Sequence, residues 1–138
     1  MKKSEPVSHI MSKNVQAVKI DSHLSEVIDT IRRNNIRHIP VMRDNHVVGI
    51  ISSTDINRLT FGTLFDNQDS ADDAVLEMLK IEQVMTSNPK VVSADTSIKE
   101  VAEIFSDFKY HALPVVESDR LVGIVTTTDV IRYLLAQY

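Results

Sequence analysis

The sequence predicts an α/β (α+β) fold in which two similar β-α-β-β-α units pack through their sheets with pseudo-twofold symmetry. The chain matches itself when it is shifted by 74 positions, and 14 of the 49 positions in 11–59 are then identical to those in 85–133. Two of the three glycines and two of the four prolines match each other in this alignment. Because glycine and proline constrain the backbone, their agreement indicates that the two repeats share one fold.

Each repeat begins with a short helical turn, which ends at Met11 or Met85, followed by an extended segment at residues 16–20 or 90–94. A helix comes next, because an Asp-Ser or Asp-Thr pair offers N-cap oxygens and apolar residues then recur at helical spacing. The caps and apolar residues are Asp21-Ser22 with Leu24, Val27, Ile28 and Ile31, and Asp95-Thr96 with Ile98, Val101, Ala102 and Phe105.

A hairpin and a second helix complete each repeat. In the first repeat two apolar runs, residues 39–42 and 47–51, flank the polar turn 43–46, and the second repeat has the same pattern. The proline in the first run is expected at the start of its strand, where a missing N–H is tolerated. The second helix is expected to begin at Ser53 or Thr127.

One module covering residues 1–138 is predicted, with repeat one at 7–60, a connecting helical segment at 61–80 and repeat two at 81–138. A single repeat of about 50 residues is marginally stable alone. Two repeats packed sheet against sheet would share a core, which favours one domain over two.

In the connecting segment, Gly62 is expected to end the preceding helix, and Ser70 to open another through a capping box. A calcium-binding loop from Asp66 to Glu77 is the alternative. It is disfavoured because Ala71 stands where such a loop needs glycine.

Composition excludes several classes of function. The net charge is −4, which argues against nucleic-acid binding as the main function. Without cysteine, disulfides, zinc thiolates and a cysteine nucleophile are excluded. The apolar runs are too short to span a membrane, and no apolar stretch follows the basic N-terminus as in a signal peptide. We therefore expect a cytoplasmic protein that does not bind membranes.

Catalytic signatures are missing as well. The five histidines show no metal-ligand spacing, and the sequence contains no nucleophile elbow and no Walker loop. We expect a binding protein rather than an enzyme, with no bound metal.

The string GIISSTD, Gly49 to Asp55, recurs as GIVTTTD, Gly123 to Asp129. In both copies a strand runs into a helix N-terminus, which presents free N–H groups and the positive end of the helix dipole. Glycine in a strand often marks close approach of a ligand or of another backbone. A carboxylate beside hydroxyls can accept hydrogen bonds from a diol, such as the ribose of a nucleotide. The alternative is that Ser, Thr and Asp only cap the helix, and the spacing does not decide between the two.

The chain resembles a tandem pair of CBS domains, a module named after cystathionine β-synthase and also called a Bateman module. The resemblance covers about 9–60 and 83–135. It rests on VMTSNPKVVSADTSIKEVAEIF, YHALPVV and LVGIVTTTDVI in the second repeat, and on HIMSKNVQAVKIDSHLSEVIDTI, IRHIPVM and VVGIISSTDI in the first. It implies two β-α-β-β-α units packed through their sheets, dimerising into a flat disc.

The resemblance also implies clefts for adenosine-containing ligands, each built from both repeats, with the string's aspartate on ribose and its hydroxyls on ribose or phosphate. One cleft would join Asp55, Ser52 and Thr54 to Thr86, Asn88, Lys90 and Val91. The other would join Asp129, Thr126 and Thr128 to Ser12, Asn14, Gln16 and Ala17. Phosphate would meet Arg37 and His38 in the Asp129 cleft, and His111, aided by Lys90, in the Asp55 cleft.

The resemblance implies a non-catalytic regulatory module that senses AMP, ADP, ATP, S-adenosylmethionine, NAD or a cyclic dinucleotide. No cofactor is required, and the adenine nucleotide is a regulatory ligand. The expected partners are a second copy of the chain and a regulated protein, because the sequence has no effector domain. The alternative is a dimerisation or protein-interaction module with vestigial clefts.

Overall fold

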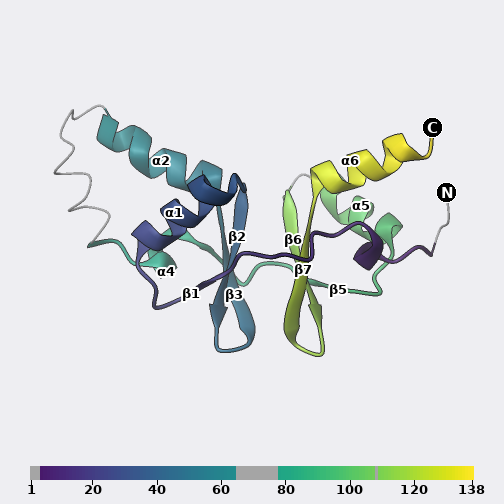
Figure 1. The fold of residues 1–138 in the computed structure, drawn as a ribbon, viewed down its shortest axis with the longest axis horizontal. Coiled ribbons are helices and arrows are strands. Elements are labelled where there is room, and N and C mark those ends of the chain that lie inside the picture. The colour runs from purple at the N-terminus through teal and green to yellow at the C-terminus, as the bar shows by residue number, and fades with distance from the viewer. Residues whose placement is uncertain (1–3, 65–77, 108) are drawn as a thin grey trace. The chain divides into compact units, whose positions relative to one another are not determined.

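The computed structural model describes residues 4–64, 78–107 and 109–138. The chain divides into two compact units (Figure 1). The central unit consists of Gln16–Pro89, and the terminal unit combines Met1–Val15 with Lys90–Tyr138.

The central unit contains a four-stranded sheet in the order β1-β2-β3-β4. β1 is parallel to β2, and the other neighbouring strands are antiparallel. Its elements are β1 (Val18–Lys19), α1 (Leu24–Asn34), β2 (His38–Arg43), β3 (His46–Ser52), α2 (Ser53–Leu64), α4 (Ile81–Val84) and β4 (Thr86–Ser87). The strands and helices predicted for the first repeat are therefore confirmed in their order.

The terminal unit repeats this arrangement around a three-stranded sheet, β5-β6-β7. Its elements are the 3-10 turn η1 (Val7–His9), β5 (Val92–Ser93), α5 (Ile98–Ser106), β6 (Ala112–Glu117), β7 (Arg120–Thr126) and α6 (Thr127–Ala136). Ser12 forms a bridge to Ile124 of β7, as Thr86 of β4 pairs with Ile50 of β3. Each of these residues has its partner 74 positions along the chain, so the symmetry of the sequence is also a symmetry of strand register.

Each unit contains a segment from the other sequence repeat. Residues 7–15 belong to the first repeat but lie with β5–β7, and residues 81–89 belong to the second but lie with β1–β3. In Figure 1 the purple N-terminal segment can be followed to the labelled strands of the terminal unit. The compact units therefore differ from the sequence repeats. The packing of the two units through their sheets stays a prediction.

Each unit has its own hydrophobic core. In the central unit, Leu24, Val27 and Ile31 of α1 pack with Ile39 and Ile51 of the hairpin. The helical stripe predicted from spacing is confirmed in both units. The corresponding core residues of the terminal unit are Val101 and Phe105 of α5 with Leu113, Val115 and Val125 of the hairpin. Burial of these side chains stabilises each unit by about 1.5–3 kcal/mol per large residue.

The predicted N-caps of α1 and α5 are wrong. Ser22 N donates to Lys19 O (2.9 Å) and Thr96 N donates to Ser93 O (3.1 Å), so these residues form turns after the short strands. The observed N-caps lie one residue further on, at His23 and Ser97. Only Ser97 caps through its side chain, which accepts from Glu100 N at 3.1 Å.

The prediction for Gly62 is also wrong, because α2 continues through it to Leu64. Glycine inside a helix costs about 1 kcal/mol relative to alanine, which is not enough to end a helix. The helix predicted from Ser70 and the alternative calcium loop lie outside the described residues.

The two matched prolines lie inside their strands rather than at the start. Pro40 is the third residue of β2. Arg37 O accepts from Ser53 N (2.7 Å), so in the alternating antiparallel ladder residues 39 and 41 face β3 and residue 40 faces away from it. On that side β1 pairs only with residues 41 and 42, and the missing N–H of Pro40 therefore removes no ladder bond.

Candidate site at the strand-to-helix junctions

The repeated string forms the same hydrogen-bonded junction in both units. In the central unit, Ser52 N donates to Asp55 Oδ2 (2.9 Å) and Asp55 N donates to Ser52 Oγ (3.1 Å). In the terminal unit, Thr126 N donates to Asp129 Oδ2 (2.9 Å) and Asp129 N donates to Thr126 Oγ1 (3.2 Å). These are reciprocal capping boxes. The capping role considered from the sequence is therefore confirmed for both aspartates.

Capping uses only one oxygen of each carboxylate. Asp55 Oδ1 lies 4.0 Å from Arg58 Nη1, whose side chain is 78% exposed, so this ion pair is weak. Asp129 Oδ1 has no hydrogen-bond or ion-pair partner among the described residues. Both aspartates are half-buried, and Thr54 and Thr128 beside them are exposed. Each junction thus combines an available acceptor oxygen with an exposed hydroxyl.

A neighbouring segment brings further predicted residues to the strand that leads into each junction. In the central unit, Thr86 pairs with Ile50 of β3, and Asn88 N donates to Val48 O at 3.1 Å. Asn88 adopts the left-handed backbone region, with φ of 50°, which asparagine tolerates better than most residues. Both side chains are exposed.

In the terminal unit the equivalent segment is the N-terminal one. Ser12 N donates to Ile124 O (2.9 Å), and Ile124 N donates to Ser12 O (3.0 Å). Ser12 and Asn14 are exposed beside β7, which ends at Thr126. The structure therefore brings Ser12 together with the Asp129 junction and Thr86 with the Asp55 junction, as the resemblance implies.

The two matched glycines explain how these segments approach the hairpins. A side chain at Gly49 would collide with Met85, whose Cγ would lie 2.9 Å from the added Cβ. At Gly123 the added Cβ would lie 2.9 Å from both Met11 Cγ and Ser12 O. The close approach expected at these glycines is thus made by a segment of the chain itself. The contacts of Met11 and Met85 with these glycines were not predicted, although the two methionines match each other in the repeat and this match indicated a shared role.

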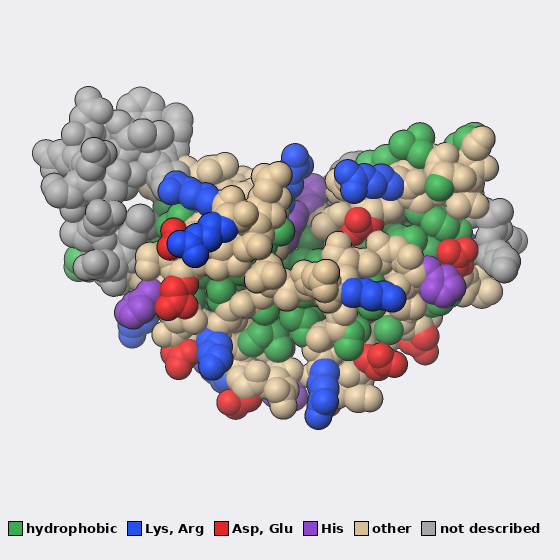
Figure 2. Space-filling model, viewed as in Figure 1, with side chains coloured by type: hydrophobic (Ala, Val, Ile, Leu, Met, Phe, Trp, Pro, Cys, Tyr) green, Lys and Arg blue, Asp and Glu red, His purple; other side chains and the backbone are tan. Residues whose placement is uncertain are grey.

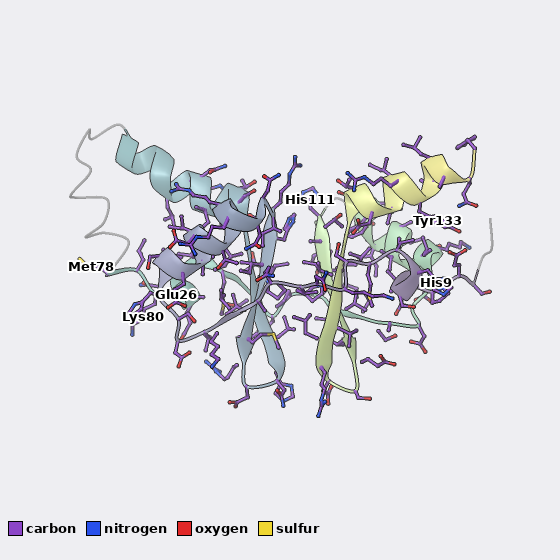
Figure 3. All side chains as sticks on the ribbon, in the orientation of Figure 1. His9, Glu26, Met78, Lys80, His111 and Tyr133 are labelled. Carbon is purple, nitrogen blue, oxygen red and sulfur yellow. The ribbon has the colours of Figure 1, made fainter. Side chains whose placement is uncertain are left out.

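The predicted phosphate-binding residues lie at the first residue of the first hairpin strand or directly before it: His38 begins β2, Arg37 precedes it, and His111 precedes β6. Arg37 O accepts from Ser53 N (2.7 Å) and His111 O accepts from Thr127 N (3.1 Å), so these residues adjoin the first residues of α2 and α6. His38 pairs with Ser52 in the sheet. Figure 3 labels His111 beside the start of α6. Within one unit, Arg37 and His38 thus accompany Asp55, and His111 accompanies Asp129.

Four predicted residues lie in a different unit from the aspartate with which they were predicted to share a cleft. Gln16 and Ala17 belong to the central unit, and Lys90 and Val91 to the terminal unit; all four are exposed. The predicted clefts would each combine residues of both units, and they stay predictions. The assignment of Arg37 and His38 to the same cleft as Asp129 also stays a prediction.

Two other kinds of functional feature are absent from the described part of the chain. It contains no group of three or more His, Cys, Asp and Glu residues placed to hold a metal ion. No helix in the same residues has both the length and the apolar character that a membrane span requires.

Comparison with known proteins identifies the family. The family model for the CBS domain matches residues 7–61 and 81–136. Protein MJ1225 of Methanocaldococcus jannaschii is 30% identical over 95% of this chain, which spans 43% of that relative's length. The solved CBS domain pair of protein MJ0100, in complex with 5′-methylthioadenosine and S-adenosyl-L-methionine, has a TM-score of 0.79 and 27% identity, covering 96% of this chain and 98% of that one. The CBS-pair protein CBSX2 of Arabidopsis thaliana has a TM-score of 0.80 and 26% identity, covering 97% and 96%. The chain therefore belongs to the CBS-domain family and contains a tandem pair of CBS domains.

Proposed function

We propose that this chain is a non-catalytic regulatory module that binds adenosine-containing ligands at its two strand-to-helix junctions. The observation that carries the proposal is the pair of matching capping boxes, each of which keeps one oxygen of a half-buried carboxylate available beside an exposed hydroxyl. A carboxylate oxygen can accept two hydrogen bonds, which suits the two hydroxyls of a ribose.

The ligand class is supported by the CBS domain pair of protein MJ0100, which was solved with 5′-methylthioadenosine and S-adenosyl-L-methionine. Those two ligands share an adenosine group. AMP, ADP, ATP, NAD and those cyclic dinucleotides that contain adenine share it as well and complete the set of candidates.

The proposed roles follow the chemistry of each side chain. Ribose would be held by Asp55 with Ser52 and Thr54, and by Asp129 with Thr126 and Thr128. Adenine would lie against the backbone at Ser12, Asn14, Gln16 and Ala17, and at Thr86, Asn88, Lys90 and Val91. Phosphate would contact Arg37, His38 and His111, with Lys90 as a further cation.

A second copy of the chain is the proposed structural partner. α6 and the residue that follows its C-cap expose Ile131, Leu134, Leu135 and Tyr138, at 55%, 40%, 66% and 104%. This spacing forms one apolar stripe, the α6 stripe, and Figure 2 shows hydrophobic side chains gathered over this helix. Exposed apolar patches of this kind mark interaction surfaces. Ligand binding would act on this dimer, or on a regulated protein, only through different affinities for two states.

A dimerisation module with vestigial sites is the second candidate. It is favoured by the same exposed stripe and by the capping role of both aspartates, which gives them a structural reason to be present without a ligand.

Isothermal titration calorimetry distinguishes the two candidates. AMP, S-adenosylmethionine and 5′-methylthioadenosine are titrated, with 2′-deoxy-AMP as the matched control that lacks one ribose hydroxyl. We expect binding of at least one adenosine ligand and about tenfold weaker binding of its deoxy analogue, as for a hydrogen bond to a charged acceptor. Equal binding of AMP and 2′-deoxy-AMP would remove the ribose assignment, and no binding of any adenosine ligand would favour the dimerisation module.

A further inference from the structure

A polar cluster around Glu5 ties together three elements of the terminal unit. Tyr133 Oη on α6 donates to Glu5 Oε1 at 3.2 Å, and His9 Nδ1 on η1 lies 3.5 Å from Glu5 Oε2. The backbone oxygen of Glu5 accepts from Ile98 N at 2.8 Å, which satisfies the first N–H of α5. Figure 3 labels Tyr133 and His9 in this part of the terminal unit. A single residue of the N-terminal segment therefore contacts α5, α6 and η1.

The segment from Glu5 to Ser12 is held along its whole length. Val7 is completely buried in the core of the terminal unit, and its N–H donates to Thr96 O at 2.7 Å. Ser12 at the other end exchanges two backbone hydrogen bonds with Ile124. These contacts anchor the segment from Glu5 to Ser12, which lies beside the Asp129 junction, to the terminal unit.

Tyr133 connects this segment to the proposed ribose acceptor. It lies four residues after Asp129 on α6, so the two side chains lie on the same face of the helix. The hydrogen bond from Tyr133 to Glu5 therefore fixes α6, which carries Asp129, against the segment that carries Ser12 and Asn14.

At the matching positions of the central unit the side chains cannot form this bond, because both are leucine. The positions that match Glu5 and Tyr133 are Leu79 and Leu59, which pack against the hydrophobic core of the central unit. Apolar contacts are non-directional, whereas a hydrogen bond specifies both a distance and an angle. The two junctions are alike in their capping boxes but differ in how their surroundings are positioned.

We propose that Tyr133 and Glu5 are positioning residues that hold the terminal-unit site ready for ligand, so that it binds adenosine ligands more tightly than the central-unit site. This inference rests on the proposed function. A site held in its binding geometry loses less conformational freedom when the ligand binds, which raises its affinity.

The protonation state of Tyr133 supports this role. Desolvation, the hydrogen bond to Glu5 and the charge of Glu5 all raise the pKa of Tyr133 above its usual value of 10.0. The hydroxyl is therefore a protonated donor throughout the physiological pH range.

The test is calorimetric titration of the full chain with AMP, in variants that isolate each site. In an Asp55→Ala background only the terminal-unit site keeps its aspartate, and there Tyr133→Phe and Glu5→Ala are each expected to weaken AMP binding about threefold to tenfold. The double variant, with Tyr133→Phe and Glu5→Ala together, should bind no more weakly than either single variant, as for two partners of one bond.

Two further variants serve as rescue and control. Glu5→Gln keeps an acceptor for the Tyr133 hydroxyl and should restore most of the affinity. Tyr110→Phe is the matched control in the same unit, because the Tyr110 hydroxyl has no hydrogen bond among the described residues.

The comparison of the single aspartate variants completes the test. Asp129→Ala should remove the tighter binding event and Asp55→Ala the weaker one, while Tyr133→Phe in the Asp129→Ala background should change nothing. Unchanged affinity in Tyr133→Phe and Glu5→Ala, together with loss of binding in Asp129→Ala, would overturn the positioning role and leave the proposed function standing. If neither aspartate variant changes AMP binding, the ribose assignment itself fails. Titrations are run well below the unfolding temperature of each variant, so that a loss of stability alone does not change the measured affinity.

Discussion

At Asp129 one carboxylate caps α6 and, under the proposed function, also binds ribose, and substitution can separate these two roles. Asparagine keeps an oxygen that can accept from Thr126 N, but it replaces Oδ1 with an amide donor. We expect Asp129→Asn to keep the capping box and the stability of the wild type while AMP binding falls about tenfold or more. Asp129→Ala should lose both, with about 0.5–2 kcal/mol of unfolding free energy lost through the cap. Calorimetry and urea unfolding measure the two effects, and wild-type binding by Asp129→Asn would assign this aspartate to capping alone.

The two glycines of the repeated string differ in what surrounds them, although the sequence shows them as equals. An added methyl at Gly49 meets only Met85 side-chain atoms among its three nearest neighbours, whereas at Gly123 it also meets the backbone oxygen of Ser12 at 2.9 Å. We expect Gly49→Ala and Gly123→Ala each to cost about 1–3 kcal/mol of unfolding free energy through overpacking.

Removing the methionine opposite should separate the two cases. Met85→Ala should recover much of the loss in Gly49→Ala, while Met11→Ala should recover less in Gly123→Ala, because Ser12 O remains. Urea unfolding of the four single and two double variants measures the recovery after the cost of each methionine truncation is subtracted. Equal recovery at both sites would show that the backbone contact at Gly123 carries no penalty.

At the scale of the elements, the order of helices and strands could be predicted from two kinds of signal. These are the periodic patterns of apolar residues and the glycine and proline residues that match between the two repeats. The stripe at Leu24, Val27 and Ile31 predicted α1, and the paired apolar runs predicted both hairpins. The exchange of segments between the repeats could not be predicted in this way. β4 has only two residues, and a two-residue strand is too short to show a period. The partner of Ser12 is likewise set by backbone bonds that any residue could make.

The exchange of segments leads to a prediction that differs from the one that the sequence repeats alone would give. Val7 and Ile81 match each other in the alignment, yet Val7 is fully buried in the terminal unit and Ile81 is 1% exposed in the central unit. We expect Val7→Ala to reduce hydrogen-exchange protection of β6 and β7, and Ile81→Ala to reduce that of β2 and β3. Each substitution should cost about 1–4 kcal/mol in its own unit, because it leaves a cavity in the core.

Each variant is the matched control of the other, and exchange measured by mass spectrometry assigns the change to peptides of one unit. Loss of protection in the hairpin of the same sequence repeat would contradict the exchange of segments. An equal loss in all four strands would indicate that the chain unfolds as one cooperative unit, so that the two cores have no separate stability.

For the whole molecule, the near-symmetry of the two units makes their few differences informative. Both have the capping box and the glycine–methionine contact, but only the terminal unit has the bond between Glu5 and Tyr133. The alignment of the two repeats contains this difference, because Glu5 aligns with Leu79 and Tyr133 aligns with Leu59. It could not be interpreted from the alignment, because residues 128 positions apart meet only in the folded chain.

The α6 stripe leads to the last prediction, which concerns assembly. Leu135 is 66% exposed at the middle of this apolar face, and a charge there would be desolvated if the face were covered by the same face of a second copy. We expect the wild type to be a dimer by size-exclusion chromatography with light scattering, and Leu135→Glu to be a monomer at the same concentration. Gln137→Glu adds the same charge on the same segment outside the stripe and should remain a dimer. A wild-type mass of one chain at every concentration would show that this face does not bind a second copy.

Because the capping box at Asp129 lies at the other end of α6, the monomeric variant should still bind AMP. Loss of both dimerisation and AMP binding in this variant would mean that the ligand site is completed only in the dimer.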